Sequence, residues 1–191
     1  GGAMLIGKGG PATTSISTAD ATSVTVRGRD LCSDLMGRLS FTAYFYLLLT
    51  GREPTETQCY FLDLLLVAIA EHGLVPTNQA ARMTYAADPA SLQGAVAAGI
   101  LGCGTVVLGT AELCGRFLAD AKAKVNQGLD PAAVLKAMVA DIRAQGGKVP
   151  GFGHPLHKPV DPRAERILAL ADSKGVSAVH VGLAHDAANA V

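Results

Sequence analysis

Successive helix signals joined by short connectors constrain the fold of this chain more than any other feature. Ser40 precedes the apolar run 41–50, which stops at Gly51, and a capping box of Thr55 with Gln58 opens a run over 55–72 that Gly73 closes. Asp130 and Asp161 each stand before a proline, which places a cap ahead of proline at the first helical position. This pattern predicts an all-α globule.

Strand patterns are confined to the beginning of the chain. Residues 13–26 are rich in Ser, Thr and β-branched side chains, which favours a short hairpin or an extended arm. We therefore expect residues 1–23 to hold a remnant of tag removal and an extended arm, and residues 24–191 to form one helical domain. The expected helices cover about 29–36, 41–50, 55–72, 78–87, 91–101, 107–123, 131–144, 163–174 and 177–189.

The composition narrows the classes of partner. Sixteen basic residues balance sixteen acidic ones in 191 residues, so no basic field favours nucleic acid or an anionic membrane surface. Hydrophobic residues make up 49% of the chain and charged residues 17%, which excludes intrinsic disorder. So few charges on so apolar a chain indicate that another subunit covers part of its surface, and we expect a homo-oligomer.

One uncharged stretch, residues 89–111, is long enough to be weighed as a membrane span. Its many glycines and its lack of flanking basic or aromatic residues favour buried helices that pack closely through glycine instead. Four separated cysteines without a CxxC spacing are interpreted as reduced core thiols, and no secretion signal follows Met4. We therefore expect a cytoplasmic protein.

A long connector over 145–160 is the strongest candidate site. Gly151 and Gly153 flank Phe152, so backbone N–H groups could approach a ligand closely, and His154 follows on a proline-bounded turn. The alternative is a surface loop with incidental histidines. His154 and His157 form an HxxH pair, but the intervening proline prevents the helical spacing of zinc motifs, so no metal is expected.

Arg163 and His72 each have a structural interpretation that is weighed beside a functional one. Arg163 lies in the first turn of an expected helix, where a cation opposes the helix dipole, so it either binds a carboxylate or pairs with Asp161 or Glu165. His72 is expected at the C-terminal end of the helix over 55–72, where a histidine gains modestly from the dipole.

The segment from Pro150 to Arg163, PGFGHPLHKPVDPR, resembles the signature of the citrate synthase family, G-F/Y-G-H followed by a basic position and D-P-R. Three more stretches agree in order. They are Val26-Arg27-Gly28, the run from Ser40 to Thr55, and Glu71-His72-Gly73 continued through Ala80-Ala81-Arg82. The resemblance covers about residues 24–175, and the short build is most similar to the citryl-CoA lyase branch.

The resemblance implies an intertwined helical homodimer that makes or breaks a carbon–carbon bond between acetyl-CoA and oxaloacetate. Citryl-CoA cleavage is the expected reaction and citrate synthesis the alternative. A coenzyme A thioester would be a substrate, with no tightly bound cofactor. His72 and His154 would hold oxaloacetate, with Arg163 and Arg82 as further substrate-binding residues. The backbone of Val149, Pro150, Gly151, Phe152 and Gly153 would contact the CoA adenine, and Lys158 its phosphates.

The chain departs from the family pattern at three places. Val107 aligns with the histidine that polarises the thioester carbonyl, and Val75 with an asparagine after H-G-x. The family's catalytic aspartate would fall beyond Val191, so the chain is expected to be truncated and impaired as an enzyme. These departures leave open a member with another 2-oxoacid or acyl-CoA, or a non-catalytic relative that binds CoA metabolites.

Overall fold

The computed structural model describes residues 13–153, 160–176 and 178–191 and confirms an all-α protein with a short N-terminal β arm. Strand β1 (Ser17–Ala19) pairs antiparallel with β2 (Val24–Val26), and β2 pairs with β3 (Arg29–Asp30). The turn between β1 and β2 is held by Asp20, whose carboxylate accepts hydrogen bonds from the backbone N–H groups of residues 22 and 23. The expected hairpin is therefore present.

The chain divides into two compact units, residues 1–70 and 71–191. The first contains the β arm, a single π-helical turn η1 (Leu31–Leu35), and helices α1 (Phe41–Thr50) and α2 (Glu56–Ile69). Its core is formed by Val26, Leu35 and Leu47. The Ser40 cap, the Gly51 stop and the Thr55 capping box are all confirmed. The helix expected over 29–36 is shorter, because residues 29–30 extend the sheet and Asp30 caps the turn that follows.

An arginine pair on Glu53 ties the β arm to the helices of the first unit. Arg29 donates to Glu53 Oε1, and Arg38 Nη2 lies 2.6 Å from the same oxygen. The hydrogen bond from Arg38, then that from Arg29, lowers the pKa of Glu53 from 4.5 to about 2. A carboxylate whose pKa is lower in the folded than in the unfolded chain stabilises the fold at pH values above its unfolded pKa. This contribution to stability is lost as the pH falls through the pKa of the folded state.

We expect Glu53→Gln to make the first unit less sensitive to acid between pH 4.5 and about 2, the window set by the two pKa values of Glu53. Midpoints of thermal unfolding at pH 7 and pH 2.5 measure this, and the fall between them should be smaller in the variant. Glu56→Gln is the control, since Glu56 forms no ion pair within the described residues. An equal fall in the wild type and Glu53→Gln would contradict the assignment.

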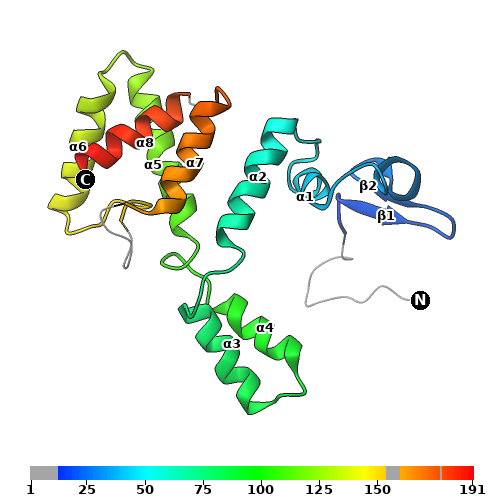
Figure 1. Ribbon diagram of the computed structural model, residues 1–191. Helices are drawn as coiled ribbons and strands as arrows, with labels where there is room; N and C mark the ends of the chain where they lie inside the picture. The colour runs from blue at the N-terminus through cyan, green and yellow to red at the C-terminus, as the bar shows by residue number, and fades with distance from the viewer. Residues whose placement is uncertain (1–12, 154–159, 177) are drawn as a thin grey trace. The chain divides into compact units, whose positions relative to one another are not determined.

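The second unit begins with a helical hairpin of α3 (Pro76–Ala87) and α4 (Leu92–Leu101), which run side by side (Figure 1). Small residues allow the close approach: a Cβ on Gly99 would meet Ala81 Cβ and Thr77 O at 3.4 Å, and one on Gly102 would meet Thr77 Cα at 3.3 Å. Close packing of the uncharged stretch through glycine is therefore confirmed, but its expected burial is wrong for the single chain, since Ala95 is the one buried residue of α4. No helix of the described residues is both long and apolar enough to cross a bilayer.

Helices α5 (Thr110–Val125), α6 (Pro131–Ala144) and α8 (Val179–Ala190) pack on one another around the main core (Figure 1). Helix α7 (Pro162–Ser173) follows the long connector. The expected caps Asp130 and Asp161 both accept backbone hydrogen bonds at the starts of α6 and α7. The buried residues of this core are Phe117, Ala121, Val134, Leu135, Val139, Val149, Leu183 and Ala187.

Two of the helix boundaries that differ from the sequence expectation concern candidate site residues. Helix α2 ends at Ile69, so His72 lies in the connector to α3 rather than on a helix end, and the expected dipole contact is wrong. Helix α5 begins at Thr110 rather than near Val107, because Leu108 has φ 72° in the left-handed region, which cannot continue a helix. Both residues are therefore presented from turns.

Candidate active site

The connector before α7 begins with a tight turn whose two ends are fixed in the core. Val149 is buried, and Phe152 packs edge-to-face on Phe117 with ring centroids 6.4 Å apart. Between them, Pro150 precedes Gly151 with φ 81°, and the N–H of Phe152 donates to the carbonyl of Val149 at 3.4 Å. This is the arrangement of a type II turn, which favours Pro-Gly at its centre. The candidate CoA segment is therefore held in place by the core.

Position 151 requires glycine because its backbone packs against another side chain of the protein, a contact that the sequence did not reveal. A Cβ at this position would lie 2.7 Å from both Cβ and Sγ of Cys114 on α5, closer than atoms can approach. Burial raises the pKa of the Cys114 thiol. At Gly153, by contrast, φ is 97° and a Cβ would meet no atom of the described residues within 4 Å. Of the two glycines, Gly153 is the one whose backbone the described residues leave open to a ligand.

Arg163 is held side-on by the carboxylate that also caps α7. Asp161 Oδ1 accepts from the backbone N of Arg163 at 2.9 Å and from its Nε at 3.0 Å, while Oδ2 accepts from Nη2 at 2.7 Å. The hydrogen bond to Asp161 raises the pKa of Arg163. Of the two interpretations of Arg163, the pair with Asp161 is confirmed; a carboxylate-binding role stays a prediction.

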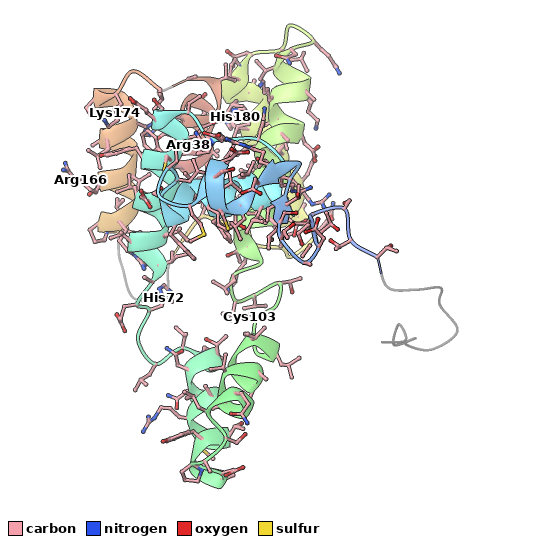
Figure 2. All side chains as sticks on the ribbon, turned by 90° about the vertical axis from the view of Figure 1, so that its right-hand side faces the viewer. Arg38, His72, Cys103, Arg166, Lys174 and His180 are labelled. Atoms are coloured by element: carbon pink, nitrogen blue, oxygen red, sulfur yellow. The ribbon has the colours of Figure 1, made fainter. Side chains whose placement is uncertain are left out.

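His72 meets Arg163 although the two are ninety-one positions apart in the chain. Arg163 Nη1 lies 3.2 Å from His72 Nδ1. The His72 connector, visible in Figure 2, is itself fixed: Gly73 N donates to Glu71 Oε1 at 2.7 Å, and the Asn78 side chain donates to the carbonyl of Gly73. Two of the predicted site residues therefore come together in the described chain, from a connector and a helix start.

The remaining predicted site residues are placed as follows. Arg82 is exposed on α3, where it lines a groove of about 440 Å³ with Tyr85, Leu92 and Val96. No hydrogen bond or ion pair joins Arg82 to His72 or Arg163 in the described part of the chain. His154 and Lys158, together with the HxxH pair, lie outside the described residues. Their roles stay predictions.

Val107 sits half-buried in the turn between α4 and α5. Its carbonyl accepts from Gly104 N at 2.9 Å, and Gly109 N donates to the carbonyl of Gly104 at 2.9 Å. A Cβ on Gly109 would lie 2.7 Å from Gly104 O and Thr105 Cα, so this turn is also closed by glycine. The valine side chain can neither donate a hydrogen bond nor titrate.

The cysteines were expected in the core, and for two of them this is wrong. All four are free thiols, but Cys32 and Cys103 are exposed and only Cys59 and Cys114 are partly buried. Cys103 follows the end of α4, and its Sγ lies 3.7 Å from the carbonyl oxygen of Gly99. Within residues 13–153, 160–176 and 178–191, no three His, Cys, Asp or Glu side chains are grouped as metal ligands would be.

Comparison with known proteins identifies the family of this chain. The family of the citrate synthase C-terminal domain matches residues 12–182. The chain belongs to the citrate synthase family. Among curated relatives, the citrate synthase of Haloferax volcanii is 32% identical over 148 residues, 73% of this chain and 35% of that protein. The citrate synthase of Heyndrickxia coagulans is 31% identical over 130 residues, 66% of this chain and 32% of that protein. The chain thus spans about a third of the length of these relatives.

Solved structures agree with the family assignment. Citryl-CoA lyase from Hydrogenobacter thermophilus superposes with a TM-score of 0.79 at 30% identity, covering 94% of this chain and 67% of that one. ATP citrate lyase from Methanothrix soehngenii, solved with citrate and coenzyme A, gives a TM-score of 0.77 at 21% identity over 95% of this chain and 29% of that one. The second likeness bears on the fold alone.

Proposed function

We propose that the chain carries the citryl-CoA site of a citryl-CoA lyase: cleavage of citryl-CoA to acetyl-CoA and oxaloacetate. The observation that carries the proposal is the contact of His72 with Arg163, two residues that belong to separate family motifs. The likeness to a citryl-CoA lyase over 94% of this chain supports the same branch. Citrate synthesis from acetyl-CoA and oxaloacetate is the alternative, in keeping with the curated relatives.

The proposed reaction is a retro-aldol cleavage. The tertiary hydroxyl of the citryl group gives its proton to a base, the adjacent carbon–carbon bond breaks, and its electron pair forms the thioester enolate. The hydroxyl carbon becomes the ketone of oxaloacetate, and the enolate takes a proton to give acetyl-CoA. The site must therefore supply donors to the oxygen that changes charge and cations to the carboxylates.

The predicted residues divide these tasks. His154 would donate to the oxaloacetate carbonyl oxygen, His72 would hold the same molecule, and Arg163 and Arg82 would bind carboxylates. The backbone of residues 149–153 would contact the CoA adenine, and Lys158 would meet phosphate. Coenzyme A enters as part of the substrate, so the proposal needs no tightly bound cofactor. Residues 24–191 would form this domain and residues 1–23 its arm.

A homodimer joined through the α3–α4 hairpin completes the proposal. Leu92, Val96 and Ile100 recur every four residues on α4 and are 65%, 53% and 65% exposed. Gly99 of α4 and the Gly102 that caps it face α3 instead. An uncharged helix that is apolar on both sides is expected to be covered. A second copy of the chain is the partner that fits this face of α4, because the helix itself carries no charged residue and its pairing with a copy needs no charge complementarity.

The first experiment is direct. Citryl-CoA is added to the protein, and acetyl-CoA is followed by mass spectrometry while oxaloacetate is followed by its reduction to malate. Release of both in equal amounts supports the lyase. Citrate formed from acetyl-CoA and oxaloacetate, without turnover of citryl-CoA, would favour the synthase.

Val107 favours a second candidate, a non-catalytic relative that binds CoA metabolites. Losing one preorganised donor costs about 3–4 kcal/mol of transition-state stabilisation. Val107→His restores a donor at that turn. A rise in turnover would support an enzyme, whereas CoA thioester binding without turnover in either form would favour the binding protein.

Arg163→Leu is expected to weaken oxaloacetate binding about 100-fold, because a carboxylate would lose a charge-assisted hydrogen bond. Arg166→Leu is the matched control: Arg166 is exposed on the same helix and projects outward in Figure 2. Isothermal titration of oxaloacetate against both variants measures the difference. Equal affinity in the two variants would contradict the assignment of Arg163.

A further inference from the structure

The contact between Arg163 and His72 restricts where His72 carries its proton. A guanidinium has only donors, so in the 3.2 Å contact Arg163 Nη1 donates and His72 Nδ1 accepts. A nitrogen that accepts cannot carry a proton, and a neutral imidazole then carries its proton on Nε2. A doubly protonated ring would also direct an N–H at a cation. The contact therefore selects one form of His72.

The orientation of Arg163 depends on Asp161. The carboxylate engages the backbone N–H, Nε and Nη2, and so occupies the Nε–Nη2 edge of the guanidinium. The opposite edge, with Nη1, is the one that faces His72. A bidentate pair of this kind fixes direction as well as distance. Its side chains are 33% and 21% exposed, so the pair is partly shielded from solvent.

We propose that Asp161 is a positioning residue: its carboxylate aims Arg163 Nη1 at His72 Nδ1 and so fixes His72 as a neutral imidazole with its proton on Nε2. Nε2–H is then a fixed donor for an acceptor oxygen of the ligand, such as a carboxylate or a keto group. Only the identity of that ligand rests on the proposed function; the choice of tautomer does not.

The test is the nitrogen spectrum of the histidine rings in the full chain, labelled with ¹⁵N and recorded near pH 8, above the ordinary histidine pKa of about 6.5. The chain has five histidines, and the signals missing from His72→Gln assign His72. The expected wild-type spectrum has His72 Nδ1 at the unprotonated position and Nε2 at the protonated position, fully separated. A protonated Nδ1 would overturn the proposal.

Asp161→Asn removes the charge but keeps the helix cap, because asparagine caps as well as aspartate. In this variant the two His72 signals are expected to move toward each other as the tautomers exchange, and oxaloacetate affinity should fall about tenfold. Glu165→Gln removes the same charge from the same first turn of α7 and should leave both readouts unchanged. Wild-type His72 signals in Asp161→Asn would overturn the positioning role.

Two further outcomes keep the test decisive. Should Asp161→Asn fail to fold by circular dichroism, Arg163→Ala keeps the aspartate cap and removes the donor, and it should cause the same averaging of the His72 signals. Should oxaloacetate fail to bind the wild type while its His72 spectrum is as expected, the proposed function fails and the positioning of His72 stands.

Discussion

Replacing Ile100 by glutamate is expected to convert the proposed homodimer into monomers. Ile100 is 65% exposed in the single chain, so the substitution leaves the fold of the monomer within about 0.5 kcal/mol of the wild type. In the dimer the same glutamate would be buried without a partner, a change that costs about 3–5 kcal/mol. The dimer dissociation constant should therefore rise at least ~100-fold.

Sedimentation equilibrium measures the effect, since the wild type should sediment at about twice the monomer mass of 19.5 kDa and the variant at that mass. Leu129→Glu is the matched control, because Leu129 is an exposed leucine, 52% accessible, in the turn before α6. It should leave the dimer intact. A wild type that sediments as a monomer at micromolar concentration would refute the homodimer, and a dimeric Ile100→Glu would refute the α4 surface.

The second large effect is expected from Gly151→Ala. Alanine in the left-handed region at φ 81° costs about 1–2 kcal/mol, and its Cβ would overlap Cys114 at 2.7 Å, which adds about 1–3 kcal/mol. We expect the free energy of unfolding to fall by about 2–5 kcal/mol. Displacement of the turn should also weaken CoA binding on the order of tenfold, because the candidate adenine contacts lie on it.

Gly153→Ala separates backbone strain from overlap, since its φ is 97° but a Cβ there would meet no described atom within 4 Å. It should cost only about 1–2 kcal/mol. In a Cys114→Ala background Gly151→Ala should recover part of its loss, because the Sγ contact is gone while the Cβ contact remains. Urea unfolding of the wild type, the three single variants and the Cys114→Ala/Gly151→Ala double variant tests this. Equal losses for Gly151→Ala and Gly153→Ala would show that the turn shifts away from Cys114 without cost.

Local features of the fold were predictable where a few neighbouring residues decide them. The Thr55 capping box, the Ser40 cap and the two Asp-Pro starts were all read from the sequence and are all present. Each depends on one side chain reaching a backbone group within three residues. The stop of α2 was placed three residues too late, because Glu71 and Asn78 bind the backbone of Gly73 and hold residues 71–75 in a turn.

The residues of the candidate site could be predicted from the sequence, but the contacts between them could not. The motifs selected His72, Arg163 and the 149–153 segment, whereas the type II turn at Pro150-Gly151 was found only in the structure. Nothing in the sequence showed that Gly151 must be glycine because of Cys114, thirty-seven positions earlier. Nor did the sequence show whether Arg163 pairs with Asp161 or with the carboxylate of a ligand, because both interactions require a cation at this position.

By itself, then, the sequence determined the helical class, the helix starts that a side chain caps, and the family of this chain, since those follow from short-range hydrogen bonds and from motifs of fixed spacing. Tertiary structure alone decided that Arg163 reaches back to His72, that Gly151 lies against Cys114, and that α4 packs its small side toward α3 and leaves Leu92, Val96 and Ile100 outside. These are contacts between segments far apart in the chain, and they depend on how the helices pack.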